Sequence, residues 1–424
     1  MSPDWFRSRD EIRFGISRAT QTHLLIKHPR SPVKMRGIGF NICPNWLSVI
    51  EREDTIYSVS THPTHPNLVM TAGEEGLVRL HDLRSPGSVF PSMEGVVVRN
   101  SEINDAQWCP TSGASHSFIV AQQNGNVCLL DSRMAFSTSI NPAENLDPKN
   151  AIHHYATWVT KAGSSSSWGP EPSSVAFSSD GMRVAITLKD FTPVLYDTFH
   201  ASPLAQFCRL RICNCQMQPS RKHGSFGGAG LGLPEDSVYC AGSDDFRVYA
   251  WAVPSRDTLE QNVRYCKSDQ WLLETDTSCM GFVTPDDPHT VSVPSCLRHP
   301  DFLLGGHRSI VNTAAFHPTL PLIFTSGVES HIRMHSMRPI PGGRASEPVE
   351  LSRVLPPSSQ LSRISFRAAA YGADTLSREE IQVYREIPRE DRTIFMFDEI
   401  LRMEEAPDIF QTRPQISLLN DYYA

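Results

Sequence analysis

Hydrophobic and polar residues alternate along short stretches of this chain, which is the pattern of a β-strand with one buried face. The clearest stretch, 54–84, predicts three strands at 56–61, 68–72 and 77–82. A proline-containing turn separates the first two strands, and a tight hairpin with glycines at both ends, 73–76, joins the second and third. This stretch therefore predicts an antiparallel three-stranded meander.

The same pattern of strands and turns returns near the end of the chain, at 306–336. Its His317-Pro318 turn stands where His62-Pro63 stands in the first copy, and it opens with Gly306-His307. Units of about 40 residues built from short strands and hairpins are typical of the blades of a WD-type β-propeller. Because one blade cannot bury both of its faces, several blades must stack around an axis.

Related stretches at 101–133, 173–199 and 237–251 bring the number of clear blades to five. WD propellers usually close with about seven blades, so two more come from the N-terminal arm or from insertions, or the ring is incomplete. The fold class we predict is all-β, a WD-repeat β-propeller with a short C-terminal helical segment. We expect an N-terminal arm or degenerate blade at 1–50, the propeller at 51–338 with insertions at 134–172 and 255–301, a linker at 339–374, the helical segment at 375–405 and a tail at 406–424.

The C-terminal segment changes to a helical period. Apolar residues at Ile394, Phe397, Ile400 and Leu401 lie on one face of a helix. Pro388 divides the segment into two short helices, and the stretch that begins at Ser377 fits a capping box. We expect these helices to dock on the domain that precedes them.

Composition limits the class of protein. With 424 residues, 40% hydrophobic content and 9% aromatic content, the chain can fill a core. A net charge of −7 and a pI near 6.1 argue against nucleic-acid binding through global positive charge. Residues 1–20 lack the apolar core of a secretory signal, and no run reaches the ~20 apolar residues of a membrane helix. We therefore expect ten reduced cysteines, a nuclear or cytoplasmic location, no membrane and no direct nucleic-acid partner.

Motifs that carry catalysis or metal binding are missing from the sequence. The glycine stretch 227–232 lacks a Walker lysine, and the cysteines lack the paired spacing of a zinc site. The acidic pairs in the hairpins are typical turn residues, so we expect no enzyme activity, no cofactor and no metal. WD blades are locked by a hydrogen-bonded set of histidine, serine, aspartate and tryptophan, which this chain keeps only in pieces. The candidates for this structural role are His307, Ser326, Ser243, Asp244 and Trp251.

One pair of motifs suggests binding. An arginine stands two residues beyond the aspartate that ends the third strand in each of two successive blades: Asp82 with Arg84, and Asp131 with Arg133. The aspartate can anchor the turn while the guanidinium presents a planar five-donor fork at the rim. These arginines are either solvated rim residues or an anchor for a partner that carries carboxylates or carbonyls. Their duplication on neighbouring blades strengthens the second interpretation.

Several stretches carry a resemblance to a known family, among them GHRSIVN from Gly306, GSDDF from Gly242, PVLYD from Pro193 and EDTIY from Glu53. On these the chain resembles the WD-repeat substrate receptors of cullin-4 ubiquitin ligases. Such receptors dock on the damage-specific DNA-binding adaptor through a Trp-Asp-x-Arg box. The resemblance implies that Asp82, Arg84, Asp131 and Arg133 contact the adaptor. His81 and Leu130 stand where the family has tryptophan.

Two functions follow as expectations. The first is a non-catalytic substrate receptor of a cullin-4 ubiquitin ligase, with the adaptor and an unidentified protein substrate as partners. The alternative is a WD-repeat scaffold that assembles a nuclear or cytoplasmic complex without a ligase role. In the alternative, Arg84 and Arg133 are ordinary rim residues.

Overall fold

The computed structural model describes residues 23–27, 47–51, 54–84, 96–136, 151–208, 222–275, 280–284, 287–336 and 355–403. Strands dominate the propeller region, and helices dominate the C-terminal segment. The N-terminal region contributes one parallel pair, β1 (His23–Lys27) with β2 (Leu47–Glu51). That pair forms a two-stranded sheet of its own.

Five blade sheets follow one another within the described residues. The first holds β3 (Ile56–Thr61), β4 (Leu68–Gly73), β5 (Leu77–Asp82) and β6 (Val96–Val98). The second holds β7 (Ile103–Trp108), β8 (Ser117–Gln122), β9 (Val127–Asp131) and β10 (Ala151–His154). The third holds β13 (Pro172–Phe177), β14 (Arg183–Leu188), β15 (Val194–Asp197) and β16 (Pro203–Phe207), with β23 (Ser295–Leu297) added in parallel at its edge.

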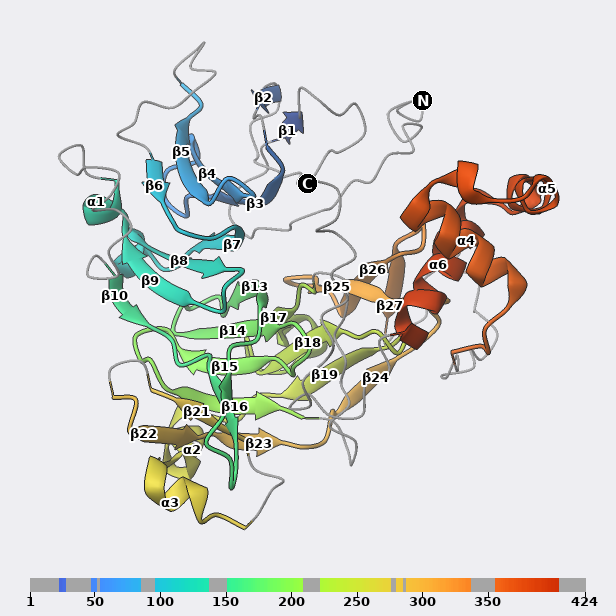
Figure 1. The fold of residues 1–424 in the computed structure, drawn as a ribbon. Coiled ribbons are helices and arrows are strands. Elements are labelled where there is room, and N and C mark those ends of the chain that lie inside the picture. The colour runs from blue at the N-terminus through green and yellow to red at the C-terminus, as the bar shows by residue number, and fades with distance from the viewer. Residues whose placement is uncertain are drawn as a thin grey trace.

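The fourth blade holds β17 (Ser225–Gly227), β18 (Val238–Gly242), β19 (Val248–Ala252) and β24 (Phe302–Leu304). The fifth holds β25 (Val311–Phe316), β26 (Leu322–Gly327) and β27 (Arg333–Ser336). Figure 1 shows the blades following one another in chain order, from β3–β6 at the upper left to β25–β27 at the right. The WD-propeller prediction is confirmed.

A buried apolar layer separates each blade from the next. Met70 and Val78 of the first blade pack with Phe118 and Leu130 of the second. Equivalent layers lie between the second and third, the third and fourth, and the fourth and fifth blades. Burial of apolar surface stabilises a fold by about 25 cal/mol for each Å² removed from water. The layers between the blades therefore stabilise the stacking of the blades. The blade is therefore the repeating unit of stability.

Asp105, only 1% exposed, joins three blades. Its Oδ1 accepts hydrogen bonds from Ser58 Oγ at 2.6 Å and from Gln107 Nε2 at 2.9 Å, and its Oδ2 accepts one from the Val175 N–H at 2.8 Å. Ser58, Asp105 and Val175 lie on the first strands of three successive blades. A buried carboxylate held by several donors fixes the packing of those strands.

The two predicted insertions fold together into a side sheet. Its strand order is β12 (Ser167–Trp168), β11 (Val159–Lys161), β21 (Met280–Val283), β22 (Thr290–Val293) and β20 (Arg264–Lys267). The join is the antiparallel β11–β21 ladder, in which Val159 pairs with Phe282. Helices α2 (Arg256–Asn262) and α3 (Ser268–Leu272) belong to the second insertion. The first insertion also supplies β10, the outermost strand of the second blade, and the second insertion supplies β23, the strand added at the edge of the third blade.

The glycine-rich stretch around residue 227 begins with β17, the first strand of the fourth blade. A Cβ atom on Gly227 would lie 2.3 Å from Phe316 Cγ, and one on Gly230 would lie 2.1 Å from the Leu320 carbonyl oxygen. Glycine is required here because the backbone approaches the fifth blade closely.

Three helices follow the blades: α4 (Gln360–Tyr371), α5 (Arg378–Glu386) and α6 (Arg389–Met403). The break at Pro388 and the Ser377–Glu380 capping box are as predicted, with the Ser377 N–H donating to Glu380 Oε2 at 2.8 Å. Helix α4 lies inside the range predicted as linker, because Ser359 and Ser362 cap its N-terminus reciprocally. Among the helices of the described residues, none is long and apolar enough to cross a membrane.

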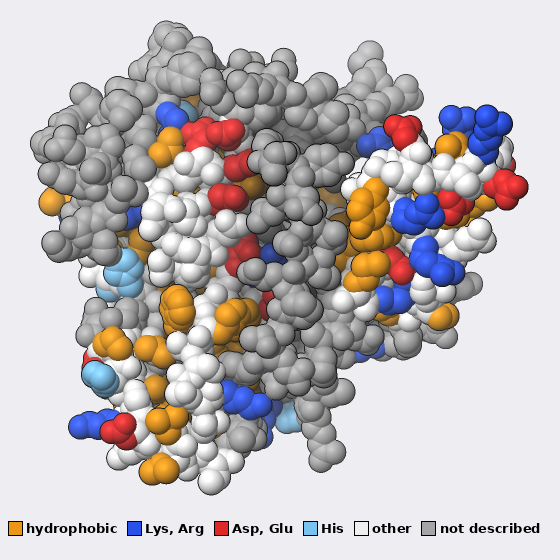
Figure 2. All heavy atoms as spheres, in the orientation of Figure 1, with side chains coloured by type: hydrophobic (Ala, Val, Ile, Leu, Met, Phe, Trp, Pro, Cys, Tyr) orange, Lys and Arg blue, Asp and Glu red, His pale blue; other side chains and the backbone are white. Residues whose placement is uncertain are grey.

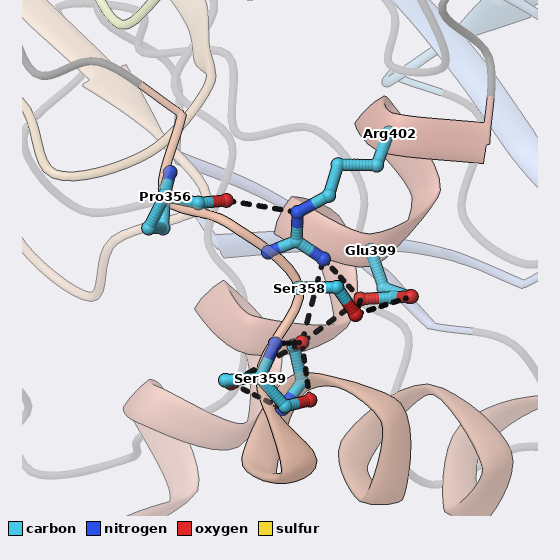
Figure 3. A network of polar contacts seen from close by, with 6 residues as sticks. Pro356, Ser358, Ser359, Glu399 and Arg402 are labelled. Carbon is cyan, nitrogen blue, oxygen red and sulfur yellow. Dashed lines mark hydrogen bonds and ion pairs between the residues drawn. The ribbon is translucent and has the colours of Figure 1, made fainter.

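A buried polar network joins α4 to α6 (Figure 3). Glu399, 7% exposed, accepts from Ser362 Oγ at 2.8 Å and pairs with Arg402, whose Nε donates to the Pro356 carbonyl at 2.9 Å. At its other end, α6 meets the fifth blade, since Arg308 Nη2 lies 2.7 Å from Asp391 Oδ1. The helices therefore dock on their own propeller.

Candidate functional site

The third strands of the first two blades end in the same geometry. The backbone N–H of Arg84 donates to Asp82 Oδ1 at 3.0 Å, and that of Arg133 donates to Asp131 Oδ1 at 2.9 Å. Each guanidinium then folds back on its own aspartate. In the first pair Nε lies 3.0 Å from Oδ1 and Nη2 2.6 Å from Oδ2, and in the second these distances are 3.1 and 2.7 Å.

The two pairs differ little in exposure or electrostatics. The arginine side chains are 69% and 67% exposed, and the aspartates 32% and 19%. The hydrogen bond from each arginine lowers the pKa of its aspartate below the usual range and raises that of the arginine. These bonds engage Nε and Nη2, so Nη1 carries two further donors at the outer edge of each guanidinium. The result is two held, outward-facing cationic forks on adjacent blades.

The residues in the tryptophan positions of these motifs support the strands from within. His81 is 8% exposed, and its Nε2 lies 2.8 Å from Thr71 Oγ1 of the neighbouring strand. Leu130 is fully buried between the first two blades. Both side chains hold the strand that ends in the aspartate, one by a hydrogen bond and one by packing.

In the fifth blade, the hydrogen-bonded side chains that lock the strands together are arranged around His307. Its Nδ1 lies 2.7 Å from Glu329 Oε2, and its Nε2 lies 2.7 Å from Thr325 Oγ1, which lies 2.9 Å from His335 Nε2. Thr325 therefore occupies the place that the sequence analysis gave to its neighbour, Ser326. Burial would by itself raise the pKa of Glu329, but hydrogen bonds from His307 and the Arg308 N–H lower it to about 2.

The three candidate structural residues of the fourth blade have different partners. Asp244 pairs with the ammonium of Lys222 at 2.5 Å, and both side chains are buried. The indole N–H of Trp251 donates to the Cys208 carbonyl at 3.1 Å, within the layer between the third and fourth blades. Ser243 donates its backbone N–H to the Arg247 carbonyl at 2.9 Å, and its Oγ accepts the Asp245 N–H at 3.5 Å. Sequence reasoning missed Lys222, because it lies outside the repeated pattern.

Metal-binding groups and charged side chains were the other candidate features in the part of the chain that the structure describes. No group of three or more His, Cys, Asp or Glu side chains there is placed to hold a metal ion. Figure 2 shows basic and acidic side chains interleaved over the C-terminal helices at the right of the view. The Asp-Arg pairs are the repeated surface feature that both sequence and geometry single out.

Comparison with known proteins supports the fold. The family model for the WD domain, G-beta repeat, matches residues 295–336. DDB1- and CUL4-associated factor 5 from Homo sapiens and from Mus musculus are each 25% identical to this chain over 297 residues, or 70% of it. The aligned region covers 25% of the human protein and 24% of the mouse protein, so the chain spans about a quarter of the length of the curated relatives it matches. The chain is thus a WD-repeat β-propeller similar to DDB1- and CUL4-associated factor 5.

Proposed function

We propose that this chain is a non-catalytic substrate receptor that docks on the adaptor DDB1 of a CUL4 ubiquitin ligase. The observation that carries the proposal is the repeated fork: Arg84 and Arg133 have the same bonds to Asp82 and Asp131 on adjacent blades. The similarity to a protein named for association with DDB1 and CUL4 supports the choice of partner.

The forks suit the recognition of carboxylate or carbonyl groups on a partner surface. Because each aspartate already holds its guanidinium, little side-chain entropy remains to be lost on binding. Each adjacent carboxylate also limits the attraction to anions, so geometry and not bulk charge sets the preference for a partner. In this proposal another surface binds the substrate, and other subunits of the ligase carry out ubiquitin transfer.

The test is capture of purified DDB1 by the wild-type chain and by the double variant Arg84→Ala/Arg133→Ala. A matched control is Arg363→Ala, which removes an exposed arginine from α4. Circular dichroism first establishes that all three proteins are folded. We expect capture by wild type and control and loss of capture by the double variant. Equal capture by all three would move the contact elsewhere, and capture by none would contradict the proposal.

The alternative remains a WD-repeat scaffold without a ligase role. One observation favours it: both guanidiniums are already bonded to their own aspartates, as ordinary rim residues would be. Failure of all proteins to capture DDB1, with the fold intact, is the result that this alternative predicts.

A further inference from the structure

The third strand of the third blade ends as the first two do, although its sequence lacks the arginine. The side chain of Asp197 accepts the N–H of Phe199, two residues on, at 2.9 Å. The intervening residue, Thr198, donates its N–H to the carbonyl of Met182 at 2.9 Å. Leu83 and Ser132 make the same backbone bond at the corresponding places in the first and second blades. Three successive blades therefore share one strand-end turn.

An arginine from elsewhere in the chain fills the vacant position. Arg256, the first residue of α2, places Nη2 3.0 Å from Asp197 Oδ2, and its Nε donates to Glu260 Oε1 at 2.6 Å. The Asp197 contact is an ion pair and the Glu260 contact is a hydrogen bond, so acidic groups lie along the Nε and Nη2 edge and Nη1 carries the outer donors. The Arg256 side chain is 38% exposed, whereas Asp197 is almost fully buried.

Packing holds α2 in this position. Leu259, 1% exposed, belongs to the apolar layer between the third and fourth blades, together with Leu204 and Trp251. Ser255 caps the helix, and the Leu259 N–H donates to the Ser255 carbonyl at 3.1 Å. Figure 1 shows α1 (Ser132–Ala135) at the upper left and α2 at the lower left of the view. The insertion therefore supplies a guanidinium at the strand end of the third blade.

We propose that Arg256 is a third docking residue, which extends the Arg84–Arg133 contact onto the third blade. The inference rests on the proposed function and identifies a further part of the same interface. Its partner is a carbonyl or other uncharged acceptor group on DDB1, next to the groups that the first two forks contact. Glu260 beside Arg256 disfavours a second acidic side chain on that flank, so one polar group approached from the Nη1 side is the chemistry that fits.

The test compares DDB1 affinity for Arg256→Ala, the double variant Arg84→Ala/Arg133→Ala, and the control Arg363→Ala. We expect Arg256→Ala to bind roughly five- to tenfold more weakly than wild type, in the range of a moderate interface residue. Arg256→Lys keeps a cation beside buried Asp197 but loses the planar fork, so it should fold like wild type and still bind more weakly.

Hydrogen exchange of the wild-type chain tests the inference without any substitution, and therefore also when Arg256→Ala does not fold. Backbone hydrogen exchange of α2 in the wild-type chain should slow when DDB1 is added, while that of α5 should not change. If the double variant loses binding but Arg256→Lys binds like wild type and α2 exchange is unaltered, the inference is overturned and the proposed function stands. If the wild-type chain itself does not bind DDB1, the proposed function fails and this inference fails with it.

Discussion

Replacing Glu329 by glutamine should weaken the fifth blade strongly, although the two side chains have the same shape. Glu329 is 4% exposed and accepts two hydrogen bonds, from His307 Nδ1 at 2.7 Å and from the Arg308 N–H at 2.8 Å. An amide has one oxygen and one NH₂ group. In Glu329→Gln, one of the two buried donors would therefore face another donor.

Two estimates of the cost agree. Leaving a buried donor unsatisfied costs about 1–3 kcal/mol, and more when the acceptor that is lost is a charged carboxylate. Separately, a protonated glutamate resembles glutamine, and the pKa of Glu329 falls from 4.5 to about 2. At ~1.4 kcal/mol for each pKa unit, that shift corresponds to about 3 kcal/mol. We therefore expect Glu329→Gln to lower the free energy of unfolding by about 3 kcal/mol.

Urea unfolding followed by circular dichroism measures this loss, with Glu74→Gln as the matched control. Glu74 is exposed in the equivalent hairpin of the first blade, so its substitution should change the free energy of unfolding by less than about 0.5 kcal/mol. A shift of the urea midpoint for Glu329→Gln no larger than that for Glu74→Gln would refute the reasoning.

Three further predictions concern the propeller. Asp105→Ala leaves three donors from successive blades without their acceptor and should cost about 3–5 kcal/mol in urea unfolding; a loss below about 1 kcal/mol would count against its bridging role. Burial first, then neighbouring basic side chains, lower the pKa of His62 and of His335 to about 4. Both rings therefore stay neutral when folded, so the stability they contribute is complete above pH 6.5 and falls towards pH 4; equal urea midpoints at pH 7 and 5 would contradict this. Gly227→Ala should cost about 1–3 kcal/mol through its clash with the fifth blade, whereas Gly113→Ala, which meets nothing within 4 Å, should be neutral; equal melting temperatures for the two variants would argue against the close approach.

Repetition made most of the blades predictable from sequence. The stretches 54–84 and 306–336 share their strand spacing and a His-Pro turn. In both copies the histidine of that turn makes the same hydrogen bonds. His62 Nδ1 accepts the N–H groups of Thr64 and His65, and His317 Nδ1 accepts those of the two equivalent residues. A side chain that caps its own turn leaves a local signal, and local signals can be read from one sequence.

The features that escaped prediction depend on contacts between distant residues. Strands β11 and β21 have three and four residues and pair across more than a hundred positions, which no periodicity reveals. The Arg256–Asp197 pair likewise joins an insertion to a blade. By contrast, Arg84 and Arg133 were found because each lies two residues from its aspartate. Sequence alone located the forks that are local and missed the one that the fold assembles.

The most direct test of the central claim is a calorimetric titration of purified DDB1 into the folded full chain and into folded Arg84→Ala/Arg133→Ala. If the two forks anchor the adaptor, wild type should bind with measurable affinity and the double variant should bind about a hundredfold more weakly, or not at all. Equal dissociation constants for the two proteins, or no binding by wild type, would contradict the claim.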